Sequence, residues 1–173
     1  MRVVRAAEFN VQQCMEFAEY FHNTALSSEG LTELTEYYSA EDAPEGNGLQ
    51  KVTLASDIET IGWRDLAPKV SGNVVWEIKE SNQTYTSIVL KYQVKAAGNS
   101  KSEDRYNVTE FFKVRFLKGK ASLEVYERTM HEVFEGKEKN FSKSGLVLGL
   151  REDEVDFLTD EDGDHVSLSL IHI

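Results

Sequence analysis

Residues 74–94 read VVWEIKESNQTYTSIVLKYQV, and this segment predicts the central architecture of the chain. Two runs rich in β-branched and aromatic side chains, residues 74–80 and 85–94, flank a short polar connection at residues 81–84. Such a pattern is typical of two strands joined by a hairpin turn. Downstream, residues 108–117 and 121–128 repeat it around Lys118-Gly119-Lys120. The sequence therefore predicts two antiparallel hairpins whose strands are long enough to curve.

Upstream of these strands, residues 6–26 have the period of an amphipathic helix. Its apolar side chains fall three to four residues apart: Val11, Cys14 or Met15, Ala18, Phe21 and Ala25, with Phe17 and Tyr20 widening the stripe. A second, shorter helix is expected through Leu31, Leu34 and Tyr38, with Ser27 or Ser28 as its N-cap. After Leu49 the apolar period shortens towards two, which places Asp57 on an early strand.

These elements predict one α+β domain over residues 1–135, in which an N-terminal helical hairpin packs on the concave face of a curved antiparallel β-sheet. Residues 136–173 are interpreted as an acidic C-terminal extension. Within it, Val166 to Ile173 alternate apolar and polar side chains in the manner of a last strand.

Charge narrows the functional classes. Nineteen Lys and Arg against thirty Asp and Glu give 19 − 30 = −11 over 173 residues, which disfavours nucleic-acid binding. The acids concentrate in residues 29–45, with six acids and no base, and in residues 151–164, with eight acids and one base.

The single cysteine, Cys14, allows neither an internal disulfide nor a multi-thiolate zinc site. No apolar run is long enough to span a bilayer or to form a signal peptide core, so the chain as written is expected to be soluble.

Two short motifs resemble metal sites, and both are interpreted as structural. His131-Glu132 begins like a His-Glu-x-x-His zinc helix, but Glu135 stands where the second histidine is needed. Residues 160–164 are rich in carboxylates, yet the Gly and Glu positions of a calcium-binding loop are not met. Phosphate-binding, dinucleotide-binding and nucleophile-elbow motifs do not occur in the sequence. The sequence therefore predicts no metal and no cofactor.

The order of elements, two helices followed by a bent sheet of hairpins, is similar to that of the nuclear transport factor two-like α+β cone. Within it, Ala7-Glu8-Phe9, Phe17 to Phe21, Glu33-Leu34 and Tyr37-Tyr38 resemble the aromatic-rich start of the TcpC-type conjugation proteins. That group belongs with the VirB-type bitopic assembly subunits of type IV secretion systems. The resemblance covers roughly residues 5–128.

The resemblance implies a non-enzymatic scaffold that binds other secretion-channel subunits or itself during conjugation. It also implies an extracytoplasmic place in the cell envelope. Members of that family carry a cytoplasmic tail and a transmembrane helix ahead of the domain. Both are absent from this sequence, so the chain would be the soluble part of a longer, membrane-anchored protein. No catalytic residues accompany the resemblance.

Three other interpretations remain open. The same cone hosts pocket enzymes and small-ligand carriers, and for such a role His22, Tyr20 and Asp57 are the candidate catalytic residues, although a histidine near a helix end also serves to cap it. Basic and aromatic side chains on residues 91–128 are compatible with an anionic partner or with a solvated outer sheet face. The third interpretation is a phage or virus-like structural protein.

Overall fold

The computed structural model describes residues 10–27, 29–37, 48–97 and 103–133, together with the backbone of four short strands further on. Two compact units divide the chain at residues 133 and 134. In the second unit, β6 (Phe141–Ser142) pairs with β7 (Gly145–Leu146), and β8 (Asp156–Thr159) pairs with β9 (Val166–Ser169), both antiparallel. The first unit holds a larger sheet and the helices.

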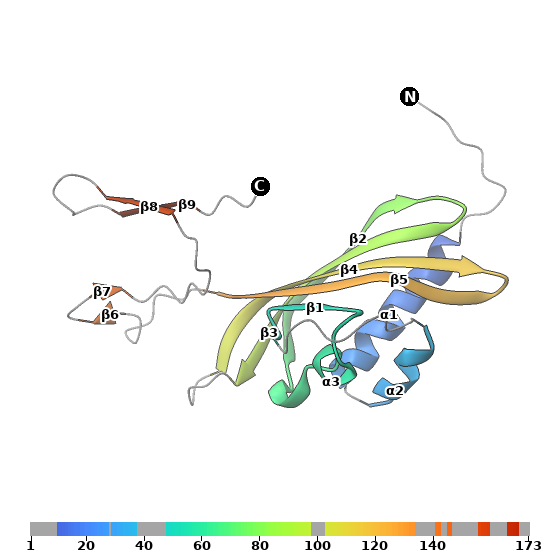
Figure 1. Ribbon diagram of the computed structural model, residues 1–173, viewed down its shortest axis with the longest axis horizontal. Coiled ribbons are helices and arrows are strands. Elements are labelled where there is room, and N and C mark those ends of the chain that lie inside the picture. The colour runs from blue at the N-terminus through green and yellow to red at the C-terminus, as the bar shows by residue number, and fades with distance from the viewer. Residues whose placement is uncertain are drawn as a thin grey trace, which may run out of the picture. The chain divides into compact units, whose positions relative to one another are not determined.

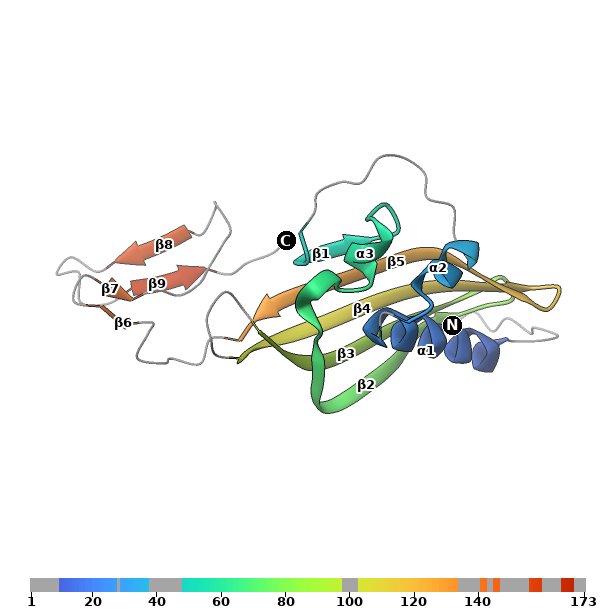
Figure 2. The same cartoon turned by 90° about the horizontal axis from the view of Figure 1, so that it is seen from below.

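A five-stranded antiparallel sheet forms the body of the first unit, with the spatial order β1-β5-β4-β3-β2 (Figures 1 and 2). Its strands are β1 (Lys51–Thr53), β2 (Lys69–Ser81), β3 (Tyr85–Ala97), β4 (Glu103–Leu117) and β5 (Lys120–Glu132). Both predicted hairpins are confirmed: β2 pairs with β3, and β4 pairs with β5. Lys118 and Gly119, with φ of 53° and 77°, turn β4 into β5 through two successive left-handed residues, as a type I′ hairpin requires.

Among the described residues, one helix of 17 residues and two helices of four residues lie together on one side of this sheet (Figure 1). They are α1 (Val11–Ser27), α2 (Leu31–Leu34), which continues into the 3₁₀ turn η1 (Thr35–Tyr37), and α3 (Ile58–Ile61), which precedes the 3₁₀ turn η2 (Arg64–Leu66). The α+β class is thus confirmed in the form of an N-terminal helix packed on an open antiparallel sheet.

The predicted apolar stripe of α1 forms much of the core. Phe17, Ala18 and Phe21 are buried, and the Phe21 ring lies 4.9 Å from that of Tyr126 on β5 and 6.1 Å from that of Phe112 on β4. Tyr20, expected to widen the stripe, is 37 % exposed instead. The helix therefore packs through a narrower face than its aromatic content suggests.

Two local predictions were wrong. Ser27 ends α1 and does not cap α2, whose N-cap is Gly30 with φ of 72°, a conformation that glycine adopts without steric cost. The alternative cap, Ser28, lies outside the described residues. Asp57 does not lie on a strand: its side chain caps α3, a single helical turn. The period-two interpretation of residues 49–63 holds only for the three residues of β1.

Candidate functional site

A buried polar cluster joins α1 to the sheet. Glu110 on β4 has no exposed surface, and its Oε1 accepts a 2.6 Å hydrogen bond from the Tyr92 hydroxyl on β3. Its Oε2 lies 3.1 Å from Nδ1 of His22 on α1, itself only 4 % exposed. Because alternate residues of a strand share a face, Leu90, Tyr92 and Glu110 all point to the side that α1 covers. Both carboxylate oxygens are thus engaged by the protein's own side chains.

Arg128 on β5 lies directly opposite Glu110 in the β4–β5 register and is also fully buried. Its two terminal nitrogens donate to the carbonyls of Ile61, at 2.7 Å, and Thr60, at 2.8 Å. Its guanidinium lies 3.8 Å from the centre of the Trp63 ring. A cation is thereby placed against the C-terminal carbonyls of α3, where it is electrostatically favoured, and on the strand next to a buried carboxylate.

The phenols beside Glu110 stay protonated. Burial, and then the negative charge of Glu110, raise the pKa of Tyr92. The same two causes raise the pKa of Tyr126, whose hydroxyl has no hydrogen-bond partner among the described residues. Tyr92 therefore acts as a fixed donor to the carboxylate and Tyr126 as core packing.

The three candidate catalytic residues lie in different environments and do not converge. His22 belongs to the buried cluster within α1 and does not cap the end of that helix. The Tyr20 hydroxyl donates to Glu33 Oε2 at 3.0 Å on the surface. Asp57 caps α3. Each of the three has a structural role that accounts for its position.

The Asp57 carboxylate accepts hydrogen bonds from Thr60 N at 2.7 Å, Thr60 Oγ1 at 2.9 Å and Arg64 at 2.9 Å. The backbone N–H of Thr60 contributes most to a lowered pKa for Asp57, and the Thr60 hydroxyl and Arg64 lower it further. A general acid requires the opposite shift. Asp57 therefore resembles a helix cap rather than a proton donor.

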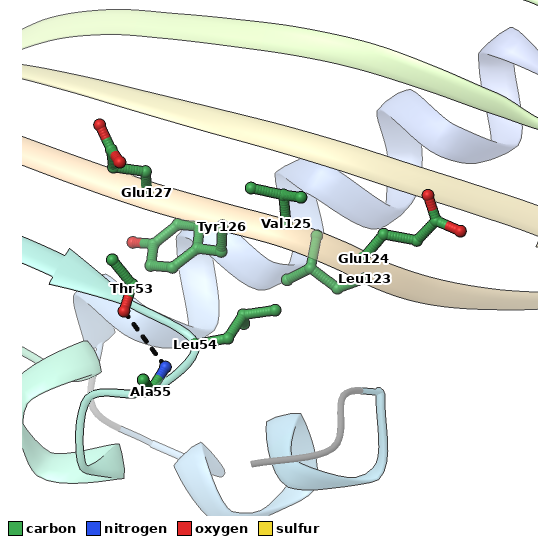
Figure 3. A pocket seen from close by; sticks show the side chains of 8 residues that line it. All are labelled: Thr53, Leu54, Ala55, Leu123, Glu124, Val125, Tyr126 and Glu127. Carbon is green, nitrogen blue, oxygen red and sulfur yellow. Dashed lines mark hydrogen bonds between the residues drawn. The ribbon is translucent and has the colours of Figure 1, made fainter. Parts of the chain in front are cut away.

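A hollow of about 510 Å³ lies where β1 stops short of the full length of β5 (Figure 3). Its wall is formed by residues 53–55 at the end of β1 and by residues 123–127 of β5. The Ala55 N–H donates to Thr53 Oγ1 at 3.2 Å on one side. None of His22, Tyr20 and Asp57 lines it. Of the buried cluster's ionisable side chains, Tyr126 lines the hollow, and Glu110, His22, Tyr92 and Arg128 do not.

Much of the basic charge on the central strands is neutralised by neighbouring acids. Glu124 pairs with Lys113 at 3.2 Å and with Arg115, while Glu127 pairs with Lys51 at 3.0 Å. Lys113 also lies 4.2 Å from the centre of the Tyr85 ring. These contacts favour the solvated outer face over an anion-binding surface.

No group of three metal-ligating side chains occurs among the residues for which side chains are described. His131 lies on an exposed part of β5. Glu135 and the acidic residues 160–164 lie outside the described residues.

The outer strand β2 exposes an unusual amount of apolar side chain. Val74, Val75 and Ile78 are 41 %, 46 % and 49 % exposed, and Val70 is 40 % exposed. Trp76 and Ile78 pair with the buried Leu90 and Ile88, so they share the side of the sheet on which α1 lies. The contacts of α1, however, are mainly with β3, β4 and β5. Trp76 packs against the core partly buried, whereas Ile78 on the same side of β2 remains exposed.

On its outer side, β2 pairs with no strand among the described residues. The β2–β3 register shifts between Ser71 and Val75, where Gly72 has φ of 82°, and again between Ile78 and Glu80. Residues 75–78 are the regular portion between these irregularities. The sequence alone does not reveal this edge, because the same apolar run, residues 74–78, is equally compatible with a central strand.

No protein family, curated protein or solved structure matches this chain. Within the described residues, no helix combines the length and the apolar character needed to cross a membrane. The function is therefore inferred from the geometry of the chain's own residues.

Proposed function

We propose that this chain is a non-enzymatic protein-interaction module that binds its partner along β2. The observation that carries the proposal is the exposure of Val74, Val75 and Ile78 on an outer strand. An outer strand offers backbone N–H and C=O groups to an added strand, and alternate side chains supply specificity. Exposed apolar side chains gathered on one element are typical of interaction surfaces.

The hydrogen bonds of the two candidate acids, Glu110 and Asp57, favour this function over a pocket enzyme. Glu110 is engaged by Tyr92 and His22, and Asp57 is engaged by Thr60 and Arg64. A general acid or base must come within hydrogen-bond reach of a substrate proton. Here both carboxylates serve as internal acceptors.

The narrower part of the proposal is a nuclear transport factor two-like cone in an assembly subunit of a conjugation or type IV secretion apparatus, at the extracytoplasmic side of the cell envelope. Its partners would be other channel subunits or the chain itself. The aromatic-rich start of the sequence supports it, since Phe17 and Tyr37 from that pattern meet edge to face at 5.0 Å. This contact gives two of the resembling positions a shared structural role.

Site-specific photo-crosslinking in cells that natively encode the chain tests the proposal. A photoreactive side chain at Ile78 is expected to form an adduct with a defined protein, identified by mass spectrometry. The same group at Leu117 is the matched control, because Leu117 is 48 % exposed, against 49 % for Ile78, but lies on β4. Equal labelling at both positions, or none at Ile78, would contradict binding along β2.

A further inference from the structure

We infer that the partner of β2 is a second copy of this chain, paired antiparallel about a two-fold axis that passes midway between the two Trp76 residues. This inference rests on the proposed interaction function and names its partner. It is supported by the arrangement of side chains about Trp76 and by the charge balance of the strand.

The first step concerns which side chains meet. Residues opposite each other in an antiparallel pair lie on the same face. A two-fold axis perpendicular to the sheet must therefore lie midway between one residue and the same residue of the other copy. With the axis at Trp76, Val74 of each copy lies opposite Ile78 of the other, and the two Trp76 residues face each other. By alternation Trp76 and Ile78 share one face, which Trp76 fixes as the α1 side, since its ring lies 5.9 Å from that of His22. Val74 meets Ile78 from the residue next to this regular stretch. The pairing extends one apolar stripe across both copies.

The neighbouring registers are worse. An axis at Glu77 would set two carboxylates opposite each other, and an axis at Lys79 would set two ammonium groups opposite each other. Centring at Val75 or at Ile78 draws more of the pairing through the irregular stretches near Gly72 or Lys79. An axis at Trp76 places Glu77 opposite Val75, both within the regular residues 75–78, and brings in only Val74 from the irregular stretch.

The balanced charge of β2 lets two copies of this strand approach each other, although the whole chain is acidic. The chain carries a net charge of −11, yet β2 contains two bases, Lys69 and Lys79, and two acids, Glu77 and Glu80. Glu77 is bound by Lys79 and, at 3.1 Å, by Lys91 of β3, and these hydrogen bonds, the one from Lys79 foremost, lower the pKa of Glu77. Two neutral edges therefore meet without the repulsion expected from the whole chains.

Sedimentation velocity of the full chain over a range of concentrations gives the first test. We expect a reversible monomer–dimer equilibrium, which Ile78→Lys weakens by about tenfold or more, because each dimer loses two Val74–Ile78 pairs. Leu117→Lys, a charge placed at an equally exposed position outside β2, is expected to leave the equilibrium unchanged. A monomer at all concentrations, or a dimer that Ile78→Lys leaves intact, would overturn the inference.

Disulfide trapping tests the register. A mixture of Val74→Cys and Ile78→Cys chains is expected to form the mixed disulfide in preference to either homodimer, since only Val74 and Ile78 are opposite each other. The wild type serves as background, because its single Cys14 is buried. Preferential crosslinking of Ile78→Cys chains to one another would refute the axis at Trp76.

These outcomes separate the two proposals. If the wild-type chain is monomeric but the photoreactive group at Ile78 labels another protein, the self-pairing fails and the interaction function stands. If neither self-association nor an adduct occurs through β2, both fail.

Discussion

At the scale of single residues, Glu110 is the buried acid whose carboxylate the core must supply with hydrogen-bond partners. It is an ionisable group without exposed surface, and its carboxylate is held by Tyr92 and by His22, while Arg128 lies opposite it on the next strand. A buried carboxylate is tolerated only when such partners replace its hydration. The cluster is therefore expected to fix the position of α1 on the sheet.

The two buried tyrosines differ in what their hydroxyls do, and this predicts different mutational effects. Tyr92→Phe removes a donor to the Glu110 carboxylate and is expected to lower the free energy of unfolding by roughly 1.5–3 kcal/mol. Tyr126→Phe removes a hydroxyl without a partner among the described residues and should change that free energy by less than about 0.5 kcal/mol. Urea denaturation of both variants measures the difference. Equal losses would show that the hydroxyl of Tyr126 is also bonded.

Asp57 predicts a pH dependence of stability. Its pKa is lowered in the folded state, first by the Thr60 N–H, so its contribution is complete above the ordinary aspartate range and is lost as the pH falls through the folded-state value. Asp57→Asn keeps a capping oxygen but removes the charge. The unfolding free energies of wild type and variant should therefore differ at neutral pH and converge in acid. A difference that persists in acid would point to a cause other than ionisation.

At the scale of elements, the long strands, α1 and α2 were predictable from the sequence, whereas α3 was not. Residues 74–94 and 108–128 carry β-branched and aromatic runs with turn residues between them, so local sequence and final structure agree. Residues 57–67 do not: α3 is a single turn, and its cap at Asp57 and its anchor at Arg128 lie far apart in the sequence. Trp63, Arg64 and Ala67 moreover adopt positive φ without being glycine. That conformation depends on tertiary contacts, which a sequence pattern does not reveal.

The candidate site was predictable only in part, for the same reason. His22 was identified as a functional candidate, but its partner Glu110 lies 88 residues away and was hidden within a strand pattern. The apolar residues of β2 were recognised as a strand, while their exposure depends on where α1 packs. Neighbouring strands can be inferred from the sequence, whereas the coverage of a sheet by a helix requires the three-dimensional arrangement.

Close packing between α2 and α3 gives a prediction at this scale. A Cβ added at Gly62, the C-cap of α3, would collide with the side chain of Leu31 on α2. Gly62→Ala is therefore expected to lower the free energy of unfolding by roughly 1–3 kcal/mol through overpacking. In the background of Leu31→Ala the same substitution should cost much less, and a double-mutant cycle measures this coupling. Additive effects of the two substitutions would show that the residues do not compete for space.

At the scale of the whole molecule, the first unit has the contents of an independent domain. Its core cluster draws on α1, α2, α3 and the strands β1, β3, β4 and β5, and Trp76 of β2 packs against it partly buried. The described part of the second unit consists of two short hairpins. The stability of the first unit is therefore expected to come from within it.

Residues 1–133 produced alone should thus fold cooperatively, with a thermal midpoint close to that of the corresponding transition in the full chain. Calorimetry of both chains provides the comparison, and circular dichroism verifies that the sheet has formed. Failure of the shorter chain to fold would mean that residues 134–173 supply part of the core.

The succession of hairpins has a consequence for the order of folding. The β2–β3, β3–β4 and β4–β5 ladders join consecutive segments and close short loops. By contrast, β1 pairs with β5 through contacts such as Lys51 with Thr129, and His22 contacts Glu110, which is 88 residues away in the sequence. Because distant contacts cost more chain entropy before they form, the four-stranded meander should assemble early, and α1 and β1 should dock late. Substitutions in the α1–sheet contact would then mainly speed unfolding and leave the folding rate nearly unchanged.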